Sequence, residues 1–355
     1  MGAVGIVAEY NPFHNGHKYH IEQTKKKLNC NCVVAVMSGN FTQRGDTAVF
    51  DMYKRAETAV QNGIDLVLAI PPQLVLQSAQ YYAYNAVYIL NSLSKIDYIS
   101  FGSEIGDIEK LKSEIDINPD FSDNIKTGVT YAKAISTEIL KEPNNTLAVE
   151  YLRALRRLNS NMIPFTIKRN KVTHNSQNTV ESFASASLLR SMLKNKEDIT
   201  SFVPSGTASI PSFEDKLINL LNYRLTLGDE FNFSNHANIS EGLNNRILKY
   251  RGQSIEEFIA KIKCKRYTET RIRRALYSII LDIKKEDILC PPTYTRVLAM
   301  TETGQKFLNS IRKTKSIETY SNLTKPIIYN NPQLKKELMI NEIYKQLTIL
   351  KHHQA

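Results

Sequence analysis

Short apolar segments that alternate with helix-like stretches constrain the fold of this chain more than any other feature. In the first four segments the apolar residues are continuous, which is typical of parallel strands that are covered on both faces. Crossover helices are expected at Tyr53–Asn62 and Ala79–Leu93. The sequence therefore predicts an α/β fold with a doubly wound parallel sheet. The expected strands are Val4–Ala8, Val33–Met37, Leu66–Ile70, Tyr98–Phe101 and Phe165–Ile167.

A change of composition near residue 205 predicts a second domain. The chain has 355 residues, which favours two domains, and residues 203–215 are rich in Pro, Ser and Gly, as connectors are. We expect a sheet domain at residues 1–204 and a mainly helical, basic domain with a tail at residues 205–355. Its expected, mostly helical elements are Leu217–Thr226, Ser240–Tyr250, Ser254–Lys263, Thr270–Lys284, Tyr294–Met300 and, after an irregular polar stretch, Gln333–Leu350.

The segment Asn11–His17 directly follows the first predicted strand and precedes a predicted helix at Lys18–Leu28. His14 and His17 are three residues apart and would share a face of the first helical turn. Free N–H groups and the dipole at a helix start favour anions, and Gly16 lets a ligand approach the backbone. This turn is therefore expected to bind the phosphates of a nucleoside triphosphate.

Other polar segments also follow predicted strands. Ser38 and Gly39 come after the second strand, and Gly102 follows the fourth. Because ligands of such sheets bind at the carboxyl ends of the strands, these segments and the histidine turn should face one crevice. Arg44, nearby in the sequence, could hold phosphate or RNA.

The pattern His-x-Gly-His after a first strand resembles the nucleotidylyltransferase superfamily of adenylyl- and cytidylyltransferases. More narrowly, the chain resembles the family of bacterial tRNA(Met) cytidine acetate ligases over almost its whole length. The segments that carry this resemblance are Ala8–His17, Val36–Phe41, Gln43–Gly45, Phe101–Glu104, Pro143–Asn145 and Lys265–Thr268.

This resemblance implies that residues 1–204 bind ATP, with His14 and His17 as catalytic residues. In the superfamily an oxygen nucleophile attacks the α-phosphorus and pyrophosphate leaves, so positioning and charge stabilisation dominate. The imidazoles would donate hydrogen bonds to phosphate oxygens, each worth roughly 3 kcal/mol. The implied ATP-binding residues are Val7, Ala8, Glu9, Tyr10, Asn11, Pro12, Phe13, His14, Asn15, Gly16, His17, His20, Gly102, Asn145, Arg169, Ser187 and Arg190.

Structural alternatives remain open at several of these positions. Gly102 could be an ordinary turn residue, and Arg169 a solvated side chain after the fifth strand. Asn145 could cap the helix expected at Leu147–Leu158, and Asn144 is the other candidate for the nucleotide contact.

Residues 184–190 resemble the second signature of the superfamily, a hydroxyl-rich helix start followed by an arginine. Such a helix start and Arg190 could hold the β- and γ-phosphates. Ala186 replaces a hydroxyl of the usual form, so the role of each serine is open, and Ser185 could be a simple N-cap.

The formal net charge of +11 indicates a polyanionic partner. Seven basic residues lie between 261 and 274 with a single acidic residue, Glu269, among them. Tyr267 could stack on an unpaired base, although charged runs are often only solvated faces. The expected tRNA-binding residues are Lys265, Arg266, Tyr267, Arg271, Arg273 and Arg274.

The sequence has no apolar run long enough to span a membrane and no signal-type N-terminal segment, so we expect a cytoplasmic protein. Its four cysteines lack the spacing of a zinc site and are expected to be free thiols. No dedicated metal site is expected; Mg²⁺ would arrive with ATP as the substrate, and no tightly bound cofactor is implied. The oligomeric state is left open.

Together, these features predict an ATP-dependent ligase that activates acetate as acetyl-adenylate. The acetyl group would pass to N4 of the wobble cytidine in the anticodon loop of elongator tRNA(Met), forming N4-acetylcytidine. One alternative is a metabolic adenylyl- or cytidylyltransferase that acts on a small phosphate-bearing acceptor. A second is a non-catalytic RNA-binding protein that keeps a nucleotide-binding fold as a scaffold.

Overall fold

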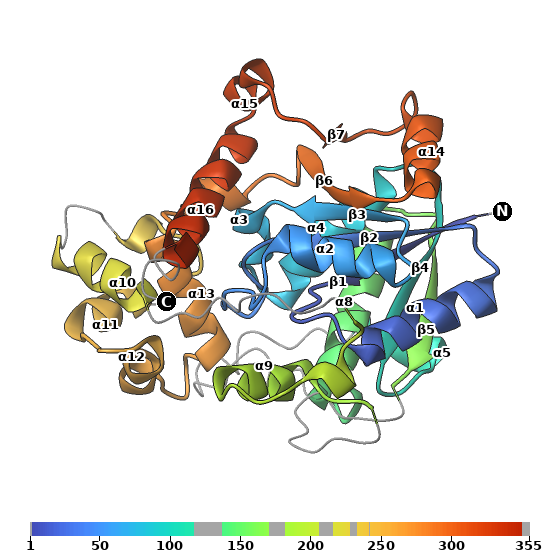
Figure 1. Ribbon diagram of the computed structural model, residues 1–355. Coiled ribbons are helices and arrows are strands. Elements are labelled where there is room, and N and C mark those ends of the chain that lie inside the picture. The colour runs from blue at the N-terminus through green and yellow to red at the C-terminus, as the bar shows by residue number, and fades with distance from the viewer. Residues whose placement is uncertain are drawn as a thin grey trace.

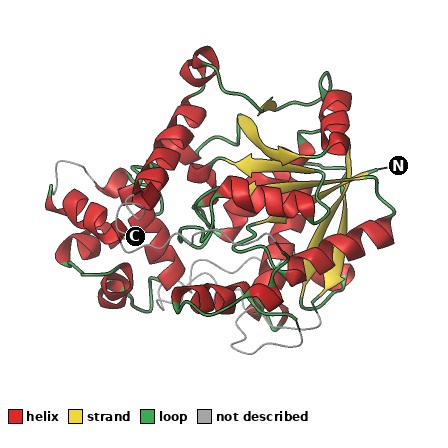
Figure 2. Cartoon of the chain, in the orientation of Figure 1, coloured by secondary structure: helices red, strands yellow, loops and turns green. Residues whose placement is uncertain are grey.

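The computed structural model describes residues 2–116, 137–169, 182–205, 216–227, 233–240 and 242–349. The strands are β1 Ala3–Ala8, β2 Cys32–Ser38, β3 Leu66–Ile70, β4 Ile96–Ser103, β5 Ile163–Lys168, β6 Tyr294–Met300 and β7 Glu318–Tyr320. They form one sheet in the order β5-β4-β1-β2-β3-β6-β7 (Figures 1 and 2). The first five strands run parallel, β6 is antiparallel to β3, and β7 is parallel to β6.

The five predicted strands are confirmed, and so is the predicted doubly wound α/β architecture. The helices around this part of the sheet are α1 Asn15–Leu28, α2 Met52–Gln61, α3 Pro72–Val75, α4 Ala79–Asn91, α5 Ile108–Lys112, η1 Ile139–Lys141, α8 Pro143–Arg157, α9 Ala186–Lys194 and η2 Thr200–Phe202. Successive residues of β2 show why both faces must be covered. Val33 packs in the cluster of α1 and α2, whereas Val34 packs in the cluster of α4 and α8.

The second half of the chain contains further helices, and several of them form a separate apolar core. They are α10 Leu217–Thr226, η5 Phe233–Asn235, α11 Leu243–Lys249, α12 Ile255–Ile262, α13 Glu269–Ile280, η6 Glu286–Ile288, α14 Glu302–Ile311, α15 Lys325–Asn330 and α16 Pro332–Ile349. Helices α10 to α13 pack together, and Tyr344 of α16 joins their core. Phe41 and Leu76, from the loops after β2 and β3, are buried in the same core. The helical part therefore packs against the carboxyl ends of the strands.

The prediction of a helix at Tyr294–Met300 is wrong, because this segment is strand β6. It pairs with β3, with Leu66 opposite Met300, and the Thr295 hydroxyl donates to the Ala69 carbonyl at 2.8 Å. β3 would otherwise expose a row of unpaired backbone groups. Two strands from beyond residue 205 thus belong to the sheet. Whether the parts on either side of residue 205 fold independently stays a prediction.

The strand order places the carboxyl ends of β1 and β4 at the point where the winding reverses. From β1 the chain adds β2 and β3 on one side, and β4 and β5 then follow on the other. Ligands of open α/β sheets bind at such a switch point. The histidine turn follows β1 and Gly102 lies near the end of β4, so the two predicted segments flank this position. No helix in the described part of the chain is long and apolar enough to cross a membrane.

Candidate active site

The two histidines of the motif cap helix α1 with their imidazole rings. His14 is the N-cap, and its Nδ1 accepts a hydrogen bond from the Gly16 N–H at 3.1 Å. The His17 Nδ1 accepts from the His14 N–H at 3.2 Å. A ring nitrogen that accepts such a bond carries no proton, so both rings are protonated on Nε2. The donors that this helix start offers to an anion therefore include two imidazole Nε2–H groups, besides the predicted backbone N–H groups.

The rings of His14 and His17 stack with their centroids 3.7 Å apart. Burial, together with the charges of His14, Arg169 and His20, holds the pKa of His17 well below its usual range. Burial and the charge of Arg169 lower the pKa of His20 to about 4. The His20 Nε2 lies 3.0 Å from the Ser100 hydroxyl of β4. Neutral rings can stack without charge repulsion and still donate hydrogen bonds to phosphate.

Aromatic side chains hold the His17 ring in place. Tyr10 has φ +48°, in the left-handed region that residues other than glycine rarely adopt, and its ring meets that of His17 at a centroid distance of 4.9 Å. Phe13 packs 4.8 Å from Tyr10 and 5.6 Å from His17. Tyr10 and Phe13 are buried. Strained backbone persists at functional sites where packing enforces it, and here it accompanies the placement of an aromatic ring beside His17.

Arg55 of α2 is a positioning residue that we did not predict. Its buried guanidinium donates to the carbonyl oxygens of Glu9, Ser38, Gly39 and Phe50. It thereby joins the ends of β1 and β2 beside the histidine turn. The spacing in the sequence could have indicated this. Arg55 lies three residues after Met52 and four before Ala59, so on a helix it shares the face of these two apolar residues, which is the buried face of α2.

Arg169 lies against Gly102, as expected for residues at the ends of the neighbouring strands β5 and β4. A Cβ at position 102 would lie 3.4 Å from the Arg169 Cγ. The Arg169 Nε is buried and has no hydrogen-bond partner in the described structure. Burial lowers the pKa of Arg169, and the charge of Glu104 opposes this shift. A buried donor without a partner is costly, which indicates that a ligand atom completes this site.

Asn144 and Asn145 both bind the loop after β4. The Asn145 Oδ1 accepts from the N–H groups of Glu104 at 2.9 Å and Ile105 at 3.1 Å, and its Nδ2 donates to the Ile139 carbonyl. The Asn144 Nδ2 donates to the Glu104 carboxylate. Both side chains therefore hold the loop that follows Gly102. The direct contact between Asn145 and a nucleotide stays a prediction.

The second signature lies beside the first motif. Ser185 caps α9, accepting from the Leu188 N–H, and its hydroxyl lies 3.0 Å from that of Ser187. Arg190 donates to the Asn11 carbonyl at 3.0 Å. Asn15 donates to the carbonyls of Ser182 and Ser201, which holds this segment against the start of α1. The structure thus brings together two helix starts that are far apart in the sequence.

Glu9 lies at the end of β1, next to the loop after β2. Its carboxylate accepts from the Gln43 N–H at 2.7 Å. Burial raises the pKa of Glu9, while the Gln43 hydrogen bond and the charges of Arg44 and Arg190 oppose the rise. The carboxylates of Glu9 and Asp46 and the guanidinium groups of Arg44 and Arg190 therefore lie near each other at this edge of the sheet. Among the remaining predicted residues, Val7 and Ala8 are half-buried, and Asn11 and Pro12 are buried.

The predicted RNA-binding run divides into exposed and structural residues. Lys265 and Arg266 are exposed. Tyr267 is buried in the helical core, so it does not offer its ring for the predicted base stacking. Core packing explains this position, since the ring lies among the apolar side chains of α10 to α13.

Arg271 and Arg273 of α13 are held by other parts of the protein, whereas the Arg274 Nε is buried without a hydrogen-bond partner in the described structure. Arg271 donates to the Ser240 hydroxyl at 2.8 Å, and Arg273 forms an ion pair with Asp46. Burial, with the charge of Arg271, lowers the pKa of Arg274 to about 10. The contacts of Arg271 and Arg273 favour a structural role for these two residues, and tRNA binding by any of the three arginines stays a prediction. Among the described residues, no group of three His, Cys, Asp or Glu side chains could hold a metal ion.

Comparisons with known proteins agree with this architecture. The family model HIGH Nucleotidyl Transferase matches residues 1–355. The crystal structure of apo Thermotoga maritima TmcAL has a TM-score of 0.87 and 27% sequence identity, covering 96% of this chain and 92% of that chain. TmcAL from the same organism bound with alpha-thio ATP has a TM-score of 0.84 and 28% identity over the same shares.

Two relatives of this chain carry the same name. A tRNA(Met) cytidine acetate ligase from Thermoanaerobacter sp. (strain X514) is 36% identical over 386 residues, covering 97% of this chain and 95% of the relative. A protein of the same name from Clostridium botulinum (strain Okra / Type B1) is 36% identical over 369 residues, covering 92% and 90%. The chain belongs to the tRNA(Met) cytidine acetate ligase family of HIGH nucleotidyl transferases.

Proposed function

We propose that this protein is an ATP-dependent tRNA acetate ligase that forms N4-acetylcytidine at the wobble position of elongator tRNA(Met). The observation that carries the proposal is the pair of imidazoles at the start of α1, whose Nδ1 atoms both accept backbone hydrogen bonds, at the switch point of the sheet. Relatives named tRNA(Met) cytidine acetate ligase cover nearly the whole chain, and TmcAL with alpha-thio ATP has the same fold.

In the first step, an acetate oxygen attacks the α-phosphorus of ATP. A bond forms between the acetate oxygen and the α-phosphorus. The bond from the α-phosphorus to the oxygen that bridges the α- and β-phosphates breaks, and pyrophosphate leaves. His14 and His17 would donate to the phosphate oxygens on which charge accumulates, and each such donor is worth about 10²- to 10³-fold in rate. Arg169 and Arg190 supply positive charge on either side of the turn.

In the second step, the N4 amine of cytidine attacks the carbonyl carbon of acetyl-adenylate. The C–N bond forms, the C–O bond to AMP breaks, and the amine gives up one proton. Free acetate is a poor acyl donor, whereas its mixed anhydride with AMP has a good leaving group. An anticodon loop suits this chemistry, because its bases are accessible while those of an RNA duplex are hidden.

We further propose that Mg²⁺ enters with ATP. Phosphate oxygens and water molecules supply most ligands of nucleotide-bound Mg²⁺, so only one or two protein oxygens are needed. The net charge of +11 supports binding of the tRNA polyanion.

The deciding experiment incubates the purified protein with ATP, radiolabelled acetate and total bacterial tRNA, and then maps the label by nuclease digestion. The expected result is label at one cytidine of tRNA(Met), dependent on ATP, with pyrophosphate released. The variants His14→Ala and His17→Ala should lose about 10²-fold or more of the rate. Pyrophosphate release without label in RNA would favour a metabolic nucleotidylyltransferase, and no pyrophosphate release would favour a scaffold protein.

A further inference from the structure

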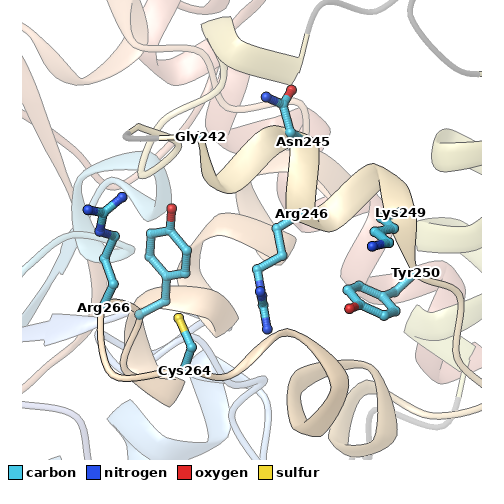
Figure 3. Close-up of a pocket in the computed structure, with 8 residues that line it drawn as sticks. Gly242, Asn245, Arg246, Lys249, Tyr250, Cys264 and Arg266 are labelled. Atoms are coloured by element: carbon cyan, nitrogen blue, oxygen red, sulfur yellow. The ribbon is translucent and has the colours of Figure 1, made fainter. Parts of the chain in front are cut away.

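A basic pocket with a volume of about 560 Å³ lies between α11 and the loop that joins α12 to α13 (Figure 3). In Figure 1 these helices lie on the opposite side of the molecule from α1, so the pocket is separate from the histidine turn. Among the described residues that line it, three are basic and none is acidic. The lining residues are Gly242, Asn245, Arg246, Lys249, Tyr250, Cys264, Arg266 and Tyr267.

The basic side chains come from two walls of the pocket. Arg246 and Lys249 belong to α11, whereas Arg266 stands on the opposite loop (Figure 3). The Arg246 Nε is fixed by a hydrogen bond of 2.6 Å to the Ile262 carbonyl. Its guanidinium carbon lies 5.9 Å from the centre of the Tyr250 ring, and the Lys249 Nζ lies 6.0 Å from it. Two cations therefore share one aromatic ring.

In the described structure, these cations differ from the neighbouring lysines Lys261 and Lys263, which are paired with carboxylates. Within the described parts of the chain, no acidic side chain forms an ion pair with Arg246, Lys249 or Arg266. By contrast, Lys261 pairs with Glu257 at 2.6 Å and Lys263 pairs with Glu269 at 3.3 Å. Three like charges around one pocket repel each other until an anion neutralises them. The ligand class is therefore anionic.

The Tyr250 ring narrows the class of ligand from anions in general to nucleotides. Tyr250 is half-buried, which fixes its orientation, and a fixed aromatic side chain beside basic groups is the usual arrangement for holding a nucleotide of a single strand. The volume is within the range of pockets that hold small ligands. A phosphodiester of the RNA would contact the three cations, and the base of the same nucleotide would stack on the Tyr250 ring.

We propose that this pocket binds one nucleotide of the tRNA, outside the cytidine that is acetylated, through its backbone phosphate and its base. This inference rests on the proposed function. It assigns RNA contacts to Arg246, Lys249 and Tyr250, in a segment predicted only to be helical, and it gives the exposed Arg266 a defined partner.

The pocket is joined to the catalytic side of the molecule through α13. Arg266 and Tyr267 directly precede this helix, and Arg273 on the helix pairs with Asp46 in the loop after β2. A nucleotide held in the pocket would therefore be fixed relative to the loop that adjoins Glu9. This arrangement suits an enzyme that must place one base of a large RNA at a distant adenylate.

The test compares two double variants that each remove two positive charges. Lys249→Gln with Arg266→Gln alters the pocket, and Lys261→Gln with Lys263→Gln alters exposed, ion-paired lysines of the same helical part. The readouts are the dissociation constant for a tRNA(Met) transcript at several salt concentrations and the formation of acetyl-adenylate without tRNA. Both variants should form acetyl-adenylate at the rate of the unaltered protein.

We expect the pocket variant to bind tRNA about tenfold more weakly. The slope of the logarithm of the binding constant against the logarithm of the salt concentration should become smaller in magnitude by about 0.7 to 0.9 for each charge removed. The control variant should change both quantities much less. If both double variants weaken tRNA binding equally, or if neither does, the pocket inference is wrong while the proposed function stands. If the unaltered protein forms no acetylcytidine in tRNA, the proposed function fails, and this inference fails with it.

Discussion

The Arg273 guanidinium on α13 donates to the Asp46 carboxylate in the loop after β2, with 2.9 Å between Nη1 and Oδ1. The neighbouring Gly45 packs directly on the same helix. A Cβ on Gly45 would lie 2.7 Å from the Arg274 backbone nitrogen and 2.8 Å from the Arg273 Cβ. The loop beside Glu9 and the helical part therefore meet backbone to backbone, with no room for an intervening side chain.

Gly45→Ala should destabilise the protein by roughly 2–4 kcal/mol, because it combines a crowded contact with a strained backbone at φ +83°. Gly242 is the matched control, since its φ is +80° but an added Cβ would meet nothing within 4 Å. Gly242→Ala should cost only about 1–2 kcal/mol from backbone strain. Urea unfolding of both variants measures the difference. Equal losses would show that the contact with α13 contributes nothing.

Stability should fall in mild acid partly because of His20. Its pKa is about 4 in the folded protein, against 6.5 for an unperturbed histidine, so the folded state disfavours the protonated ring. The contribution of the neutral ring is fully present above pH 6.5 and is lost as the pH falls towards 4. From pH 7.5 to 5 this amounts to roughly 2 kcal/mol.

The variant His20→Gln, which cannot titrate in this range, isolates that contribution. Its free energy of unfolding, measured at pH 7.5 and 5, should fall by about 2 kcal/mol less than that of the unaltered protein. His17 is present in both proteins, and its pKa is lowered mainly by burial, so most of its contribution is common to the two. An identical loss in both would mean that His20 is protonated as readily in the folded state as in the unfolded chain.

Arg169→Met should weaken ATP binding without destabilising the free protein. The buried Nε has no partner, so removing the charge relieves a desolvation cost, while the flexible side chain of methionine can still pack against Gly102. Loss of a charged hydrogen bond to phosphate should raise the dissociation constant for ATP about tenfold or more. Calorimetric titration and thermal unfolding check the two parts. A large loss of stability with unchanged ATP affinity would make Arg169 purely structural.

Arg55→Lys should be strongly destabilising even though the charge is kept. A lysine cannot serve four carbonyl groups in different directions, and a buried acceptor left without its donor costs about 1–3 kcal/mol. We expect a loss of roughly 3 kcal/mol or more in urea unfolding. Lys54→Gln on the exposed face of α2 removes only a surface ion pair with Glu57 and should change stability by less than about 1 kcal/mol. Comparable effects of the two substitutions would contradict the assigned role of Arg55.

The sheet could be predicted from local pattern because its central strands are buried on both faces. Val33 and Val34 must both be apolar for that reason, and the same holds along β1 and β3. β6 could not be predicted in this way. Its seven residues suit a strand only because β3 offers an open edge, and that edge lies more than two hundred residues earlier in the chain.

The site was predictable to the extent that adjacent residues define it. The turn with His14 and His17 and its place at the switch point follow from the motif and the strand order. The hydrogen bonds of Asn145 and the burial of Tyr267 depend on distant segments that pack against them. The basic run shows the same limit, because its charge is visible in the sequence while its ion pairs with Asp46 and Glu269 are not.

The return of the chain to the sheet as β6 restricts how RNA can be presented. β5 lies at one border of the sheet and β6 next to the other, and α10 to α13 lie between them along the chain. In the described structure these helices are joined to the sheet at two separate places, by the strand β6 that follows them and by the ion pair of Arg273 with Asp46. If these helices bind tRNA as proposed, the distance from the bound nucleotide to the cytidine is set by the sheet to which they are joined.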